Sequence, residues 1–174
     1  MRQHHLVDDY RTHFAHSRRA KRSRLLPVQN NPVLNHLDTT GCTSIETLLL
    51  QGNAALAVGD TTWASASMTT VTIVDNAGLL SLADFAIASV SGTLQISNMS
   101  ALTSLSMSAL TSVNTFLLLD NPQLSGLSMP SLHSVAVFTI FNNAQLPSTS
   151  GCTALTTIGS LLVESNPSLQ VGAC

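Results

Sequence analysis

The sequence predicts an all-β fold, a right-handed parallel β-helix of about seven coils, and three observations predict it. The pattern L-x-(L/I/V)-x-x-N-x-x-L recurs along the chain in copies that are 22 or 23 residues apart. A fixed period of this length is typical of solenoid repeat proteins. Inside each copy, successive residues alternate between two sides, as in a strand. Elsewhere Ser, Thr, Gly and Pro separate the apolar residues, and this composition disfavours helix.

Each copy supplies one strand. In the segment TFLLLDN, Phe116 and Leu118 point to one side, while Thr115 and Leu117 point to the other. Strands stacked in register form a parallel sheet with about 4.8 Å between coils, and seven coils make a stack roughly 30 Å tall. No coil buries its inward side alone, so stability depends on neighbouring coils. The other inward pairs are Leu48/Leu50, Val71/Ile73, Leu94/Ile96, Phe138/Ile140 and Leu161/Val163.

One position anchors each copy, and six of the seven anchors are Asn. The anchors are Asn31, Asn53, Asn76, Met99, Asn121, Asn143 and Asn166. An Asn amide both donates and accepts hydrogen bonds and tolerates tight-turn conformations. We therefore expect the Asn side chains to form a structural ladder that satisfies buried backbone groups, at about 1 kcal/mol net for each bond.

Met99 interrupts the Asn column, and Asn98 lies immediately before it. We expect the Asn98 side chain to turn inward and replace the missing anchor. The alternative is a modification, because Asn98-Met99-Ser100 is an N-x-S sequon, and Asn98 would accept a glycan if a eukaryote secretes the protein.

A composition boundary near residue 25 divides the chain into a basic arm, residues 1–24, and a repeat domain, residues 25–174. All seven Lys and Arg residues lie in the arm, which we expect to be disordered. Its segment RRAKRSR is interpreted as a solvated tail; a nuclear address, a nucleic-acid patch and a dibasic processing site are the alternatives. The domain contains seven acidic residues and no Lys or Arg, namely Asp38, Glu46, Asp60, Asp75, Asp84, Asp120 and Glu164.

Charge and hydropathy exclude two classes of function. A repeat domain without cations would repel a phosphate backbone, so we exclude nucleic acid as its partner. No apolar run approaches the 18 residues of a membrane span. The arm also lacks the apolar stretch of a secretory signal peptide.

Several segments resemble a known family. The segments NPQLSGLSMPSLHSV, FTIFNN and LVESNPSL resemble the repeat of receptor L domains, the leucine-rich-like β-helical modules of insulin and epidermal growth factor receptors and of fungal cell-wall proteins. GCTALTTIGS and GCTSIETLLL are similar to the leucine-rich repeats of bacterial and protist surface antigens. The resemblance covers about residues 26–170 and implies an extracellular or cell-surface location. The chain departs from the family because it shows no signal peptide, glycolipid-anchor tail or kinase.

No motif in the sequence carries catalytic chemistry, so we expect a protein that is not an enzyme, without catalytic residues, cofactor or metal. G-x-G-x-x-G, C-x-x-C, H-E-x-x-H and G-x-S-x-G are all missing. The His and Asp residues of HHLVDD, at positions 4–9, have metal-ligand spacing but are interpreted as part of a mobile tail. A carbohydrate-active β-helix is one alternative, with carboxylates from separate coils. The sparse acids argue against it, because they do not converge in one column.

Recognition is the function that the sequence favours. We expect a protein or glycan partner to bind the outward face of the main sheet, where the C-terminal half is unusually apolar. The alternative is coverage of this face by the arm or by flanking sequence. The outward positions are Leu49, Thr72, Val74, Gln95, Leu117, Leu119, Thr139, Phe141 and Leu162.

Ice binding is a second alternative function, because a column of Thr residues on a flat β-helix face would order water. The column consists of Thr47, Thr70, Thr93 and Thr115.

The three cysteines limit the possible disulfides. Cys42 and Cys152 belong to coils five steps apart, or about 24 Å at the strand spacing, whereas a disulfide needs Cα atoms within about 7 Å. Cys174 lies eight residues after Asn166, and Cys152 lies nine residues after Asn143. We therefore expect Cys152 and Cys174 to be neighbours, bonded in an oxidising compartment, while Cys42 stays single.

Overall fold

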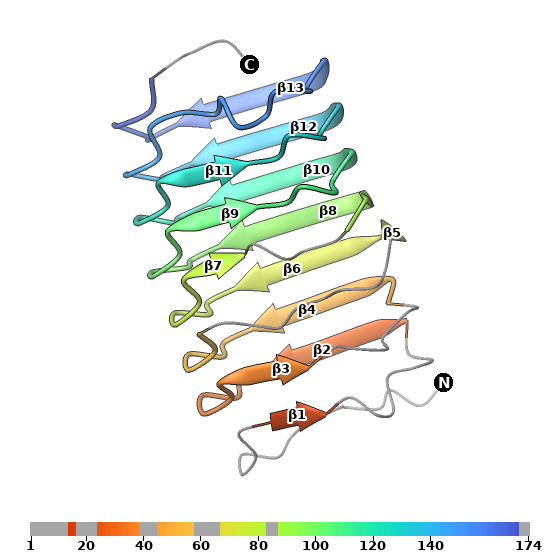
Figure 1. The fold of residues 1–174 in the computed structure, drawn as a ribbon, viewed down its shortest axis with the longest axis vertical. Coiled ribbons are helices and arrows are strands. Elements are labelled where there is room, and N and C mark those ends of the chain that lie inside the picture. The colour runs from red at the N-terminus through yellow and green to blue at the C-terminus, as the bar shows by residue number, and fades with distance from the viewer. Residues whose placement is uncertain (1–13, 17–23, 39–44, 58–66, 83–86, 171–174) are drawn as a thin grey trace.

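A computed structural model describes residues 14–16, 24–38, 45–57, 67–82 and 87–170. These residues form an all-β, parallel β-solenoid in which no helix occurs (Figure 1). About five turns of the solenoid are formed, compared with the seven that the anchors predict. Residues 39–44, 58–66 and 83–86 interrupt the first three coils and lie outside the description. No described helix is long and apolar enough to cross a membrane.

The main sheet contains seven parallel strands in succession, one for each copy of the repeat. They are β2 (Leu25–Gln29), β4 (Thr47–Gln51), β6 (Thr70–Val74), β8 (Ser89–Ser97), β10 (Ser112–Leu119), β12 (Ser134–Phe141) and β13 (Thr157–Glu164). The short strand β5 (Ser67–Met68) also pairs with β8.

Smaller sheets lie on the other side of the coils. One contains β7 (Ser81–Leu82), β9 (Ser104–Ser106) and β11 (Gly126–Ser128), all parallel. Strand β1 (Phe14–His16) pairs in parallel with β3 (His36–Asp38) at the N-terminal end of the stack (Figure 1). Three residues of the basic arm therefore form a strand, and most of the rest of the arm lies outside the described residues.

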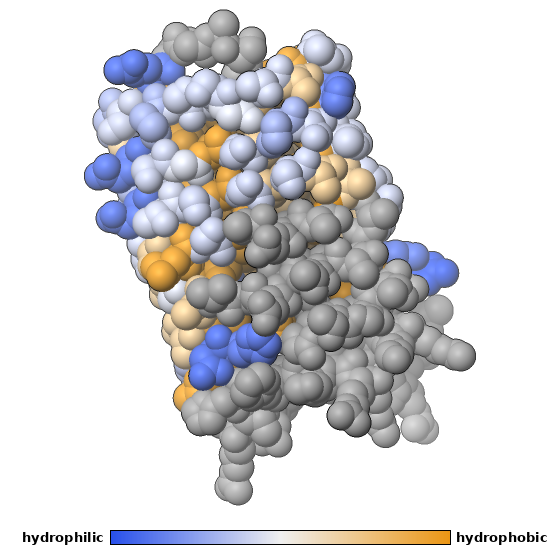
Figure 2. All heavy atoms as spheres, viewed as in Figure 1, coloured by the Kyte–Doolittle hydropathy of each residue, from blue (hydrophilic) through white to orange (hydrophobic). Residues whose placement is uncertain are grey.

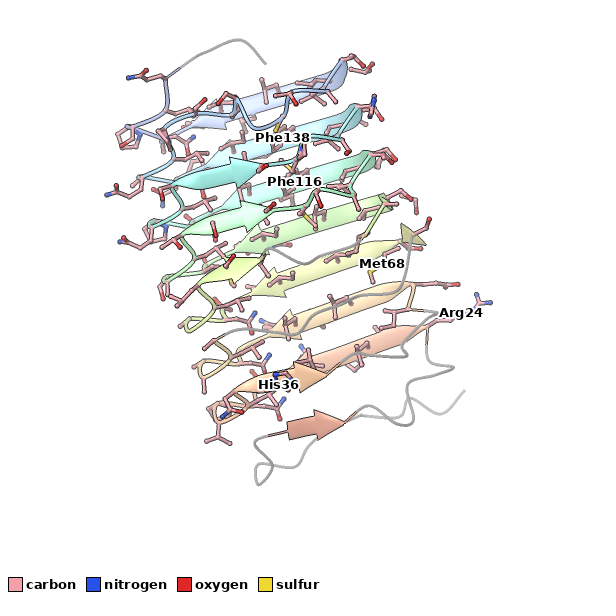
Figure 3. All side chains as sticks on the ribbon, viewed as in Figure 1. Arg24, His36, Met68, Phe116 and Phe138 are labelled. Carbon is pink, nitrogen blue, oxygen red and sulfur yellow. The ribbon has the colours of Figure 1, made fainter. Side chains whose placement is uncertain are left out.

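Two columns of the core run through the main sheet, and the remaining core residues come from the other sides of the coils. Phe116 pairs in register with Leu94 on one side and Phe138 on the other, and Leu118 pairs likewise with Ile96 and Ile140. The side chains of these residues are at most 1% exposed. The rings of Phe116 and Phe138 stack with centroids 4.9 Å apart and planes at 6° (Figure 3). Each strand thus buries its apolar side against the next coil.

A sharp corner precedes every anchor and explains the residue types found there. The residue before the anchor has a positive φ in each copy, a conformation that most side chains avoid and that Asn, Asp and Gly tolerate best. The corner residues are Asn30, Gly52, Asp75, Asn98, Asp120, Asn142 and Ser165, with φ from 55° to 68°.

The Asn anchors form a ladder along the solenoid. The Asn143 Oδ1 accepts from the backbone N–H of Asn121 at 3.2 Å and from its Nδ2 at 3.1 Å. The Asn143 Nδ2 donates to the carbonyl oxygens of Leu118 and Phe141, at 2.9 and 3.0 Å. Its backbone N–H donates in turn to the Asn166 Oδ1 at 2.8 Å. One buried amide therefore satisfies backbone groups in two coils, as expected for buried polar groups.

Met99 remains in the anchor column, and the expectation that Asn98 replaces it is wrong. The Met99 side chain is 0% exposed, and its backbone N–H donates to the Asn121 Oδ1 at 3.2 Å. Asn98 is exposed because it occupies the corner position, where φ is 55°. A side chain at this corner points away from the core. Asn98, the acceptor position of the sequon, is therefore exposed to solvent, while Met99 is buried.

Restoring the anchor at Met99 should stabilise the protein. In Met99→Asn, the new Oδ1 would accept from the N–H and Nδ2 of Asn76, which have no anchor amide in the next coil. We expect a gain of about 1 kcal/mol, because the new hydrogen bonds outweigh the lost Met packing. Urea unfolding followed by circular dichroism measures the change. The control Met107→Asn, at a buried Met outside the ladder, should destabilise by about 2 kcal/mol or more; losses of similar size in both variants would contradict the ladder mechanism.

Candidate functional site

The outward side of the main sheet carries a contiguous apolar strip over its last three strands. In β10, β12 and β13 the pairs Leu117↔Thr139↔Leu162 and Leu119↔Phe141 are in register. Neighbours in a parallel sheet lie about 4.8 Å apart, so these side chains touch across the strands. We name this surface the apolar patch, and it consists of Leu117, Leu119, Thr139, Phe141 and Leu162.

The N-terminal half of the same face is mixed: Leu49 and Val74 lie beside Gln, Thr and Ser side chains, some of which bond to one another. The Gln29 Nε2 donates to the Gln51 Oε1 at 3.1 Å, between β2 and β4. The Gln95 Nε2 donates to the Ser97 Oγ at 3.0 Å, within β8. These amides have fewer unused groups to offer a ligand. The apolar share of the outward positions is higher in β10, β12 and β13 than in β2–β8.

The structure places the nine predicted binding residues on one face but exposes them unequally. Leu162 is 50% exposed and lies on the last strand of the described residues, while most of the others are partly buried between adjacent coils. Val74 is a correction, since it is only 9% exposed. It lies in register between Gln51 and Ser97, and the stacking of neighbouring strands covers its small side chain.

Acidic groups border the apolar patch. Asp120 follows Leu119 at the corner, and its Oδ1 accepts from the Asn142 Nδ2 at 2.8 Å, which fixes the orientation of the carboxylate. Glu164 is in register with Phe141. The patch is therefore an apolar surface with negative charge at one edge, where the strands end. This charge favours a cationic group on a partner.

A groove crosses the starts of four strands on another part of the surface, and sequence reasoning missed it. Its volume is about 450 Å³. The strands bend here, with a register irregularity between Val113 and Thr115. The repeated small residues at this bend were the available signal in the sequence. The lining residues are Val90, Ser91, Ser112, Val113, Asn114, Ser134, Val135, Ala136, Thr157 and Gly159, none of them charged.

The acidic residues are arranged differently from the expectation. Asp75 and Asp120 do share the corner column, with the coil of Asn98 between them, so the prediction that the acids avoid a common column is wrong for this pair. Within the described ranges, no group of three or more His, Cys, Asp or Glu residues has the geometry of a metal site. The His and Asp residues at positions 4–9 lie outside those ranges.

Cys152 lies in the core, where it is 2% exposed. Its position continues an inward column formed by Met129 one coil earlier and Met107 two coils earlier. The N–H groups of Leu110, Leu132 and Leu155 donate to the carbonyls of Met107, Met129 and Cys152, respectively. Cys42 and Cys174 lie outside the described residues, so the proposed Cys152–Cys174 pair stays a prediction.

The other face of the solenoid differs from the main sheet. Figure 2 shows the side with β9 and β11, where the surface is mostly hydrophilic over the C-terminal coils. Its exposed positions are rich in Ser and Thr, including Thr103, Ser125 and Ser128. The apolar patch lies on the main sheet, whereas the exposed positions of β9 and β11 are mainly Ser and Thr.

Comparisons with known proteins give no match for this chain among family models, curated proteins or solved structures.

Proposed function

We propose that this protein is a non-enzymatic recognition module of cell-surface type, which binds a protein partner on the apolar patch. We further propose that it is a right-handed solenoid of seven leucine-rich-repeat-like coils related to receptor L domains. The observation that carries the binding proposal is the contiguous strip of Leu117, Leu119, Phe141 and Leu162 on the outward face of the main sheet. Exposed apolar strips with a charged edge are typical of protein interfaces.

The chemistry of the patch favours a protein over a glycan. Leu and Phe side chains offer no hydrogen-bonding groups to sugar hydroxyls, whereas they pack well against aliphatic and aromatic side chains. The carboxylates of Asp120 and Glu164 suit a Lys or Arg on the partner. A glycan is the second candidate ligand, and its place is the groove, because Ser112, Ser134 and Thr157 supply neutral hydroxyl groups there.

A binding experiment tests the patch. Peptides selected from a phage-displayed library on the immobilised chain should be apolar with a basic residue. Their affinity, measured by biolayer interferometry, should fall at least about tenfold in Leu119→Ser/Phe141→Ser, which corresponds to about 1.4 kcal/mol. The matched control is Thr72→Ser in β6 of the same sheet, outside the apolar patch, which should bind as the native chain does. Equal binding to all three proteins would contradict the proposal, and binding on a glycan array would favour the groove.

Two other functions remain as alternatives. Ice binding rests on the Thr column, in which Thr47 pairs with Thr70 and Thr93 with Thr115. The column continues as Val137 and Ser160, so the regular ladder covers only part of the sheet, and a thermal-hysteresis assay tests it. A carbohydrate-active enzyme would use carboxylates from separate coils, and release of reducing sugars from polysaccharides is its assay.

A further inference from the structure

The sequon Asn98-Met99-Ser100 lies on a turn that follows β8 in the middle of the solenoid (Figure 1). Its first and third residues are exposed, and only Met99 between them is buried. The Met99 carbonyl accepts from the Leu102 N–H at 3.3 Å, which closes the turn. An enzyme that recognises an Asn and a Ser two positions apart can therefore reach both side chains on one surface turn.

The Asn98 amide is available for reaction, in contrast to the anchor amides. Within the described residues its side chain makes no hydrogen bond. The corners beside it in the stack are Asp75 and Asp120, and both are short and polar. The Asp120 Oδ1 already accepts from the Asn142 Nδ2 at 2.8 Å. No bulky apolar group at the neighbouring corners therefore covers the Asn98 Nδ2.

A second segment of the chain has the same outer residues but is not an acceptor. In Asn166-Pro167-Ser168, Pro at the middle position prevents modification. Asn166 is also an anchor, and its Nδ2 donates to two backbone carbonyls at 2.9 and 2.8 Å. Every other Asn of the sequence lacks Ser or Thr two positions later. Asn98 is therefore the only acceptor of this type in the sequence.

We infer that Asn98 is an N-glycosylation site, which receives an oligosaccharide from a polyprenyl diphosphate donor. The Asn98 Nδ2 forms a bond to the anomeric carbon of the first sugar. The bond from that carbon to the diphosphate oxygen breaks, and the amide loses one proton as the diphosphate leaves. This modification rests on the proposed cell-surface role, because eukaryotes transfer such oligosaccharides to proteins that enter the secretory pathway.

Cell-free translation in the presence of eukaryotic microsomes tests the site. The full 174-residue chain carries a secretion leader, and only chains that the microsomes protect from added protease are examined. We expect most of them to gain one oligosaccharide, seen as a shift on gel electrophoresis that peptide N-glycosidase reverses. Ser100→Ala should abolish the shift although Asn98 is still present, and Ser100→Thr should keep it.

The matched control moves the sequon to an equivalent corner. Asn142 occupies the same corner position as Asn98, and φ is 55° at both. Ala144→Thr in the Ser100→Ala background creates a sequon at Asn142, and this variant should regain one oligosaccharide. A protected native chain that stays unmodified would overturn the inference, as would a shift that persists in Ser100→Ala.

The folded protein should accommodate the glycan. The glycosylated chain and Ser100→Ala, both purified after secretion, should unfold at the same urea concentration, because the modified amide lies in solvent and gives up no hydrogen bond. A clearly lower midpoint for the glycosylated chain would show that the folded protein covers Asn98. The peptide-binding experiment changes Leu119 and Phe141 and leaves the sequon intact, so its failure is distinguishable from a failure here.

Discussion

Asn121→Leu should destabilise the protein by about 3–5 kcal/mol. Asn121 is 0% exposed, and its Oδ1 accepts from the Met99 N–H while its Nδ2 donates to the Ile96 carbonyl at 3.1 Å and to the Asn143 Oδ1. Leu has a similar size but removes both functions, and each buried group left without a partner costs about 1–3 kcal/mol. The loss is measured as the change in the free energy of unfolding by urea.

The control for this variant is Asn114→Ala. Asn114 is exposed, and its Nδ2 makes one weak contact, at 3.4 Å, with the Thr115 Oγ1. We expect a change within about 0.5 kcal/mol, as for surface substitutions generally. If Asn121→Leu were as mild as Asn114→Ala, the ladder would be a consequence of the fold and not a source of its stability.

Leu118→Ala should cost about 2–5 kcal/mol, because it opens a cavity between stacked coils. Leu118 is 0% exposed and lies between Ile96 and Ile140. The neighbouring Leu117 points outward and is partly buried, so Leu117→Ala should cost about 1 kcal/mol for the smaller area that it loses. The two variants remove the same atoms from adjacent positions, which makes them a matched pair in a thermal or urea denaturation.

The variants Leu117→Ala and Leu118→Ala also distinguish effects on stability from effects on peptide binding. Leu117→Ala should weaken peptide binding to the apolar patch, while Leu118→Ala should alter unfolding and leave the affinity of the folded protein unchanged. Equal losses of stability would show that the assignment of inward and outward sides is incorrect, because a one-residue shift exchanges the two faces of a strand.

The strands could be predicted from the sequence because their determinants are local and repeat. Alternation around Phe116 and Leu118 specifies which side is buried, and the period then brings equivalent residues into register. The corner before each anchor was harder to predict from the sequence. Asn98 was expected to fill a gap inside, but the backbone at this position requires a positive φ, and Asn tolerates it better than most residues. Asn therefore occurs at position 98 because it tolerates a positive φ, and not because its side chain replaces the hydrogen bonds of the missing anchor at Met99.

The surface was less predictable than the core, because exposure depends on what the neighbouring coils carry. Val74 has the alternation of an outward residue, yet Gln51 and Ser97 cover it. Leu161 and Val163 have the alternation of core residues, yet they are exposed because no strand of the described residues pairs with the second edge of β13. The groove at the strand bends arises from a backbone irregularity between Val113 and Thr115 that no single residue type signals.

The uniform offset between paired strands has a consequence for how the chain folds. Every pairing on the main sheet joins residues 22 or 23 positions apart, so each new coil closes a loop of the same length. The entropic cost of closing 22 residues is about 2.7 kcal/mol plus a constant, and it does not increase as the stack grows. Folding can therefore start at any pair of coils and extend in both directions. In the 174-residue chain, unfolding should begin at β13, which pairs with one neighbouring strand in the described residues, and amide hydrogen exchange should slow progressively toward β10.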